Sequence, residues 1–242
     1  MKKTSDRRIR GWWLGGVLAL PAVLLLQAGC GGNSGDAQLR QEVADLKVQL
    51  TDLRAQSQRS ADVVAIENLE SAYGYYSDKA LYDQAADCFS RDATLEIAGR
   101  GVFVGNARIR QYLNSLPGLA YGTVFLHLQL QPVITVAADG MSALGRWRSL
   151  VQLGQLGKRS QVGEGIYENA YVKEDGVWKI SKLHFYNTYL VNYADAWLKS
   201  GEPLLGPFEN LPPDRPPSEK YEAYPGVYIP PFHYRNPVSG RQ

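Results

Sequence analysis

The second half of the sequence holds four long segments typical of β-strands, and these constrain the fold more than any other feature. They cover residues 123–136, 142–153, 161–173 and 177–190. The turn Glu174-Asp175-Gly176 separates the last two, and an Asp-Gly pair between two such segments is a strong signal for a tight hairpin. We therefore predict one sheet in which the long strands pair mostly in antiparallel fashion.

Helical periodicity comes before the long strands. Apolar residues recur at helical spacing until Ser77-Asp78, where we expect the helix to end: Val63, Ile66, Leu69, Tyr73 and Tyr76. Further helices are predicted over residues 79–89, with Arg91-Asp92 as an exit turn, and over 106–116, with short strands at 94–97 and 102–104. This order predicts an α+β domain over residues 61–198, with helices covering one face of a single curved sheet.

Positive charge is concentrated at the N-terminus. Residues 1–29 carry a net charge of +4 and residues 30–242 a net charge of −2, so the rest of the chain has no basic surface of the kind that binds nucleic acid. No glycine-rich phosphate loop follows a predicted strand, which argues against nucleotide binding.

The N-terminus has the three parts of a secretory signal. Residues 1–10 are basic, residues 12–26 are mostly apolar, and the small residues Ala28-Gly29 precede Cys30. This arrangement resembles the lipobox of bacterial lipoproteins, although Gln27 stands where that motif usually has leucine. We expect residues 1–29 to be a signal peptide, Cys30 to carry a lipid anchor and residues 30–38 to be a flexible tether. The protein would then be exported and held at a membrane, on the periplasmic or cell-surface side.

The alternative is an uncleaved membrane anchor. The 19 residues from Gly11 to Gly29 rise by ~1.5 Å each, which is barely enough to cross a hydrocarbon core of ~30 Å. Pro21 and Gln27 weaken this alternative further.

A heptad pattern follows the expected tether. Five apolar residues alternate at spacings of four and three: Leu39, Val43, Leu46, Leu50 and Leu53. Ser57 and Ser60 occupy the next two positions and end the pattern. We predict a short coiled-coil-like helix over residues 39–60. Two interpretations stay open, a stalk through which the chain forms a homo-oligomer and a single helix that packs on the domain.

The C-terminal segment, residues 199–242, is rich in proline and tyrosine. Paired prolines such as Pro212-Pro213 and Pro230-Pro231 exclude helix and central strand, so we predict an extended tail. Its aromatic density is too high for a plain disordered tail. We expect it to pack along the domain or along a neighbouring subunit.

The chemistry-bearing residues favour acid–base work without a cofactor. The three histidines lack metal-ligand spacing, the two cysteines form no cluster, and no Gly-x-Ser-x-Gly motif is present. Cys88 lies in an apolar helical context and is expected to be buried. His184 has no obvious partner, and His233 either covers a pocket or is structural. We therefore predict no metal and no cofactor.

His127 and Asp78 are the candidate acid–base pair. His127 shares one strand face with Phe125 and Gln129, and its alternative role is that of a structural histidine in the sheet. Asp78 ends the first domain helix, and its alternative role is to cap the next helix. An aromatic wall would exclude water from the pair, with Asn169 as a further hydrogen-bonding group: Tyr73, Tyr76, Phe125, Trp147, Tyr167 and Tyr171.

Several motifs resemble the SnoaL-like branch of the nuclear transport factor 2-like superfamily. They are Ala65-Ile66-Glu67-Asn68-Leu69 with Tyr76-Ser77-Asp78, then Gly101-Val102-Phe103-Val104-Gly105, and finally Tyr167-Glu168-Asn169-Ala170-Tyr171 with the hairpin that follows it. The resemblance implies a cone-shaped α+β fold with helices on the concave face of the sheet and a deep apolar cavity.

Within that superfamily, the sequence is similar to hexachlorocyclohexane dehydrochlorinase and scytalone dehydratase at Asp78 and His127. The resemblance implies a histidine base, oriented by the aspartate, that acts on a C–H beside a leaving group. Tyr73 stands where the dehydrochlorinase has a lysine. The expected function is a membrane-tethered domain that binds a small apolar molecule, with cofactor-free lyase (dehydratase) or isomerase activity. The alternative is a non-catalytic ligand-binding or oligomeric assembly module.

Overall fold

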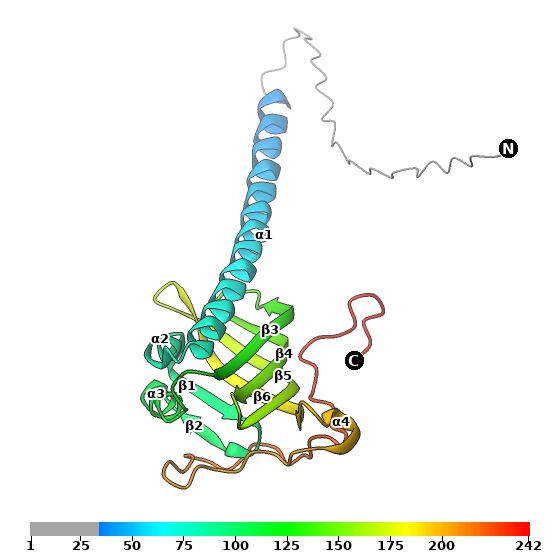
Figure 1. Cartoon of the computed structure of the whole chain (residues 1–242). Coiled ribbons are helices and arrows are strands. Elements are labelled where there is room, and N and C mark those ends of the chain that lie inside the picture. Colours follow the sequence, from blue (N-terminus) through cyan, green and yellow to red (C-terminus); the bar gives the residue numbers. More distant parts are fainter. Residues whose placement is uncertain (1–33) are drawn as a thin grey trace, which may run out of the picture. The chain divides into compact units, whose positions relative to one another are not determined.

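A computed structural model describes residues 34–242 (Figure 1). The expected signal peptide, Cys30 and the first residues of the expected tether lie outside the described residues. The chain divides into two units, residues 1–49 and 50–242. The helices and strands are, in chain order, α1 (Ser34–Asp78), α2 (Tyr82–Asp87), β1 (Phe89–Ile97), the 3-10 turn η1 (Ala98–Arg100), β2 (Val102–Val104), α3 (Asn106–Asn114), β3 (Thr123–Val136), β4 (Ser142–Gln155), β5 (Arg159–Glu174), β6 (Val177–Asn192) and α4 (Ala196–Lys199).

The described part of the first unit is helical. Helix α1 begins at Ser34, inside the segment 30–38 that the sequence predicts to be a tether, and the side chains of residues 35–49 are exposed. Gln38 donates a hydrogen bond to Glu42, and Gln41 donates one to Asp45, which are the i,i+4 pairs that stabilise an exposed helix. Among residues 34–242, no helix is both long enough and apolar enough to span a bilayer.

The second unit is built on one six-stranded sheet with the order β2-β1-β6-β5-β4-β3. All neighbouring strands are antiparallel except β1 and β6, which are parallel. The four long strands occur where the sequence predicts them, and the β5–β6 hairpin turns at Asp175 and Gly176, both with positive φ. The expected α+β class is confirmed.

The region between α2 and β1 differs from the sequence prediction. Helix α2 ends at Asp87, and Arg91-Asp92 lies inside β1 rather than in an exit turn. The reason is tertiary: Phe89 is 2% exposed and pairs with Ile180 of β6. Burial and strand pairing decide the conformation of such a short segment, and its helical spacing does not.

The core lies between the helices and one face of the sheet. Along β4, alternate residues such as Trp147 and Val151 are buried, whereas Arg146 and Arg148 point to the opposite face. The helices contribute apolar side chains to the same core, among them Ile66 from α1, Ala85 from α2, and Ile109 and Leu113 from α3.

Strand β3 is an edge of the sheet and has an irregularity at Pro132. Its pairing with β4 shifts register between Leu130 and Val133, and Gln131 has a φ of 52°. Proline has no N–H to donate, so it is tolerated at an edge strand or a bulge. Before the bulge the register is regular and sets His127 opposite Val151.

The C-terminal tail packs against the other face of the sheet. Ser218 donates two hydrogen bonds to Glu96, both at 2.7 Å, and the N–H of Tyr224 donates to the carbonyl of Thr188. Arg146 is ion-paired with Glu168, donates to the carbonyl of Pro231 and lies over the ring of Phe232.

Two histidines belong to this outer face. His184 is 1% exposed, lies 3.7 Å from Glu96 and stacks on Tyr186. His233, in the tail, lies 3.0 Å from Glu168 through its Nδ1. Both are therefore on the side of the sheet opposite the core.

We predict that Arg146 holds the end of the tail. Arg146→Ala removes hydrogen bonds to Glu168 and to the tail, and one charge-assisted bond is worth about 1.5–3 kcal/mol, so detachment should rise roughly tenfold or more. Limited trypsin digestion at Arg235, followed by mass spectrometry, measures this. The control is Arg148→Ala on the same strand face, because Arg148 bonds to Gln131 and Glu164. Equal cleavage of both variants would contradict the prediction.

Candidate active site

The structure brings Asp78 and His127 together. Asp78 is the last residue of α1, and its Oδ1 accepts a hydrogen bond of 2.8 Å from the backbone N–H of His127. The same oxygen lies 4.0 Å from the His127 Nδ1. Asp78 does not cap α2, because Leu81 occupies that position and no side chain caps the helix. The carboxylate therefore links the end of α1 to the edge strand β3.

Burial keeps His127 neutral. Desolvation lowers the pKa of His127 to about 4, so at neutral pH the imidazole carries no charge and has one free lone pair. Desolvation also raises the pKa of Asp78, and the hydrogen bond from the His127 backbone opposes that rise. The His127 side chain still has 23% of its surface exposed, so it is not sealed inside the protein.

Phe125 lies against His127, and the other residues of the predicted aromatic wall belong to the core or pack against it. The Phe125 ring centroid lies 4.7 Å from that of His127. Tyr76 is half-buried, and three other predicted wall residues are at most 5% exposed: Tyr73, Trp147 and Tyr167. Burial raises the pKa of Tyr73 and of Tyr167, so both phenols are neutral.

Asn169 and Tyr171 bind another protein residue, Glu70. The Tyr171 hydroxyl donates to Glu70 Oε2 at 2.9 Å, and the Asn169 amide donates to Oε1 at 3.0 Å. Trp147 Nε1 donates to the Tyr171 hydroxyl at 2.8 Å. Glu70 is fully buried, and desolvation raises its pKa to about 7. The Asn169 amide nitrogen and the Tyr171 hydroxyl thus hold this carboxyl, and Asn169 Oδ1 accepts a hydrogen bond from the backbone N–H of His184.

The sequence reasoning missed Glu70, although a signal was present. Glu70 lies four residues after Ile66 and three before Tyr73, on the apolar side of α1 that faces the core. A glutamate inside such an apolar stripe is seldom buried without partners. Its partners Asn169 and Tyr171 come from β5, about 100 residues later, and no local pattern identifies them.

Gln129 is a second polar residue that the site analysis did not include. Its Nε2 is buried and has no hydrogen-bond partner among the described residues. Its Oε1 lies close to Gly74 of α1. A Cβ added to Gly74 would lie 2.1 Å from this oxygen, which is closer than van der Waals contact allows. Gly74 therefore leaves the space that Gln129 occupies, on the same strand face as His127.

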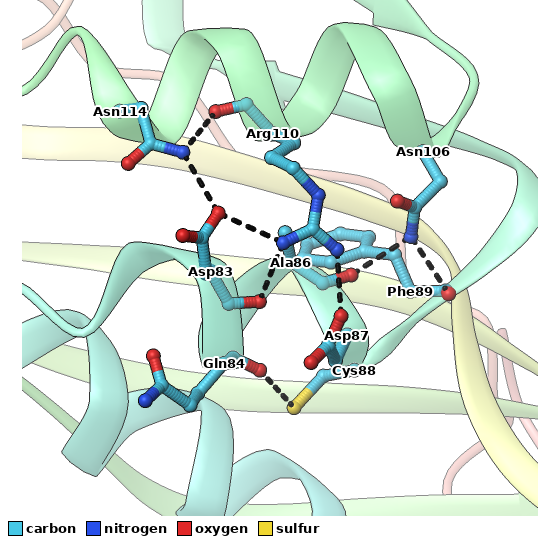
Figure 2. A network of polar contacts seen from close by, with 9 residues as sticks. All are labelled: Asp83, Gln84, Ala86, Asp87, Cys88, Phe89, Asn106, Arg110 and Asn114. Carbon is cyan, nitrogen blue, oxygen red and sulfur yellow. Dashed lines mark hydrogen bonds and ion pairs between the residues drawn. The ribbon is translucent and has the colours of Figure 1, made fainter.

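A network of polar contacts joins α2 to α3 (Figure 2). Arg110 pairs with Asp83 and Asp87, and Asn106 donates to the carbonyls of Ala86 and Phe89. An open hollow of about 710 Å³ lies beside Arg110, and two others measure about 420 and 630 Å³. The residues that line these three hollows do not include Asp78 or His127.

The same region contains Cys88, whose thiol is no candidate nucleophile. Its Sγ lies 3.6 Å from the carbonyl of Gln84 (Figure 2), and desolvation raises its pKa to about 11. In the part of the chain from residue 34 onward, no three or more His, Cys, Asp or Glu side chains are grouped so as to hold a metal ion.

The domain is thus an α+β fold in which the aspartate at the end of α1 lies beside a histidine of the edge strand β3, and comparisons with known proteins identify its family. Residues 58–184 match the SnoaL-like domain. Since this match covers more than half of the chain, the protein belongs to the SnoaL-like domain family, within the nuclear transport factor 2-like fold.

The relatives include dehydrochlorinases. The chain is 30% identical over 144 residues to hexachlorocyclohexane dehydrochlorinase 1 of Sphingobium indicum, which covers 56% of this chain and 88% of the relative. A solved hexachlorocyclohexane dehydrochlorinase of type 3 from Novosphingobium barchaimii is 25% identical, with a TM-score of 0.51, over 57% of this chain and 94% of the other.

A protein from Novosphingobium aromaticivorans, assigned as a scytalone dehydratase, has the same fold. It is 20% identical with a TM-score of 0.52, over 64% of this chain and 97% of the other. This likeness shows a shared fold. The segments before residue 58 and after residue 184 lie outside the family match.

We predict that Glu70 makes stability depend on pH. Its pKa in the folded state, about 7, lies above the ordinary glutamate value, so the folded state binds the proton more tightly. The contribution of Glu70 to the free energy of unfolding is fully present below about pH 4.5. It is lost as the pH rises through 7, and the loss is on the order of 3 kcal/mol. Glu70→Gln should remove this loss, which urea unfolding at pH 5 and pH 7.5 measures.

The difference between the wild type and the variant isolates Glu70. The lowered pKa of His127 acts in the opposite direction, because its contribution to stability rises with pH. Glu67→Gln, on the same helix but not fully buried, is the control and should keep the wild-type pH dependence. A Glu70→Gln variant with an unchanged pH dependence would overturn the account of this residue.

Proposed function

We propose that this protein is a cofactor-free lyase or isomerase that acts on a small, mostly apolar molecule, with His127 as the general base. The observation that carries the proposal is the position of the Asp78 carboxylate, 4.0 Å from Nδ1 of a neutral imidazole. The kinship with hexachlorocyclohexane dehydrochlorinase 1, named for an elimination reaction, supports the reaction type.

Asp78 would set the tautomer of His127. A carboxylate next to Nδ1 favours a proton on that nitrogen and leaves the lone pair on Nε2. A shortening from 4.0 Å to about 2.8 Å makes the hydrogen bond direct, and such catalytic bonds are often long before the substrate binds. The bond from the His127 backbone already holds the carboxylate in place, so the approach requires only a small change in the imidazole ring.

The chemical step is an elimination. Nε2 of His127 takes the proton from a C–H, the C–H electrons form the new double bond, and the bond to the leaving group on the neighbouring carbon breaks. The imidazolium is stabilised by Asp78. When hydroxide leaves, the imidazolium returns its proton and water is released, whereas an isomerisation returns the proton to another carbon. Partial burial of His127 beside Phe125 reduces its contact with water, and this strengthens the charge interactions.

Gln129 supplies a hydrogen bond to the reacting molecule in this proposal. The Gln129 side chain lies beside the Tyr167 hydroxyl, and its buried Nε2 makes no direct hydrogen bond by distance among the described residues. Gln129 lies on the face of β3 that holds His127. A donor at this position would stabilise charge that develops on an oxygen or a halogen of the substrate. It occupies the role proposed in the sequence analysis for Asn169, whose amide is bonded to Glu70.

The test begins with the ligand. Small molecules extracted from the purified protein are identified by mass spectrometry, and each is returned to fresh protein in D2O to follow elimination or deuterium incorporation. His127→Ala and Asp78→Asn should each lower turnover about 10²–10⁴-fold, because they remove the base or its orientation. His233→Ala, on the opposite face of the sheet, is the control and should retain turnover. A bound compound that the wild type leaves unchanged would favour the non-catalytic binding module.

We further propose that Cys30 is lipidated and holds the domain at a membrane. The basic, apolar and small-residue segments that precede Cys30 support this proposal. Cys30→Ser should release the protein from the membrane fraction into the soluble fraction, which immunoblotting after ultracentrifugation measures. Cys88→Ser, which changes a buried thiol, is the control and should stay with the membranes. Retention of the Cys30→Ser protein would instead support the uncleaved anchor.

A further inference from the structure

We infer that residues 39–53 of α1 form a parallel, in-register, two-stranded coiled coil with a second copy of this chain. The inference concerns a surface that the proposed activity does not use. It rests on three observations: the exposure of the heptad residues, the identity of the residues at each heptad position, and the distribution of charge beside them.

The apolar residues of the heptad pattern are exposed in the single chain. Their exposed fractions lie between 42% and 62% for Leu39, Val43, Leu46, Leu50 and Leu53. Helix α1 is continuous from Ser34 to Asp78, so these residues share one stripe along it. Five large apolar side chains on one helical stripe, left in water, are the pattern of a surface that a partner helix covers. The family match starts only at residue 58, so this stripe is not part of the SnoaL-like domain.

The residue types at the seam favour two strands. In heptad terms Leu39, Leu46 and Leu53 occupy d positions, and Val43 and Leu50 occupy a positions. Leucine at d with a β-branched residue at a favours the parallel dimer over larger assemblies, and Val43 meets this condition at one of the two a positions. The same apolar residues on a second copy of this chain can pack against this seam, so a second copy covers it without any other partner.

The flanking charges select the parallel orientation. All three e positions are basic, namely Arg40, Lys47 and Arg54, while Glu42 stands at a g position. In an antiparallel pair the e positions of the two helices face each other, and like charges would repel. In a parallel pair each g position faces the following e position of the partner, so that Glu42 of one copy meets Lys47 of the other.

The seam is short, and its association would be aided if both chains were anchored to the same membrane. A stretch of about two and a half heptads is below the length of a strong coiled coil. Two chains anchored by their N-termini to one membrane would have a high local concentration and would already be parallel. The inference does not need the anchor, because at sufficient concentration the free chain should form the same dimer.

Cysteine cross-linking of the full chain in membranes tests the orientation. Leu39→Cys and Leu53→Cys lie at opposite ends of the seam, and each alone should give a disulfide-linked dimer under mild oxidation, because d positions of a parallel pair face each other. Val48→Cys is the matched control: it is as exposed as Leu46 but lies at an f position, away from the partner, and should not cross-link. All three variants keep the native cysteines, so any background is common to them.

Two results would overturn the inference. If neither end cross-links with itself but a mixture of Leu39→Cys and Leu53→Cys chains does, the pair is antiparallel. If the Val48→Cys chain cross-links as readily as the others, no specific seam exists.

A pair of substitutions tests whether the seam drives association. Leu46→Glu and Val48→Glu change side chains that are both 61% exposed, so neither should disturb the fold. In detergent solution, native mass spectrometry should show the dissociation constant raised roughly tenfold or more by Leu46→Glu and little changed by Val48→Glu. Glu42→Lys should weaken the dimer, and adding Lys47→Glu to it should restore the dimer. Equal effects of the two glutamate substitutions would contradict the inference.

Discussion

The hydrogen bond from the His127 backbone to the Asp78 carboxylate is the contact on which the site depends. Asp78 ends α1, and His127 lies in the first half of the edge strand β3, so this bond joins two segments 49 residues apart. A charge-assisted bond of this kind is stronger than a neutral one and holds the carboxylate in a fixed direction. It sets the Asp78 oxygen beside the imidazole. The position of the candidate base is thus a consequence of how the helix end meets the sheet.

The interior of the domain combines apolar packing with a few fully partnered polar groups. Glu70 is held by Tyr171 and Asn169, and Trp147 donates in turn to Tyr171. Each of these groups would be costly to bury alone, and the network removes that cost by pairing them. Gln129 on β3 has a buried Nε2 without a direct partner among the described residues, and it shares this with other buried polar atoms such as Ser149 Oγ. The role of Gln129 toward a ligand stays a prediction.

The sequence predicted the parts of the fold that local patterns determine. The four long strands, the Asp175-Gly176 turn and the end of the helix at Asp78 follow from periodicity and turn chemistry. The local spacing of apolar residues predicts helix as far as Phe89, whereas the structure begins β1 there. The cause is the pairing of Phe89 with Ile180 of β6, a tertiary contact that local spacing does not reveal. The contact of the tail with Glu96 and Glu168 was likewise left open, since it joins segments over 60 residues apart.

At the site, the sequence predicted the proximity of residues more accurately than it predicted the role of each residue. Asp78 and His127 meet, but Asn169 and Tyr171, expected to face the ligand, bind Glu70. Their role depends on a carboxyl group from α1 that only the folded chain brings to β5. The roles of His127 and Asp78 in catalysis stay predictions that rest on their geometry.

The central claim is that Asp78 presents a neutral, oriented imidazole at His127. The most direct test is to measure the ring nitrogen chemical shifts of His127 in the ¹⁵N-labelled protein across a pH titration, with Asp78→Asn as the comparison. The account predicts that His127 stays neutral down to about pH 5, with the proton on Nδ1 and a bare Nε2, and that Asp78→Asn shifts this tautomer balance. Protonation of His127 near pH 6.5, or a proton on Nε2 that is indifferent to Asp78, would contradict it.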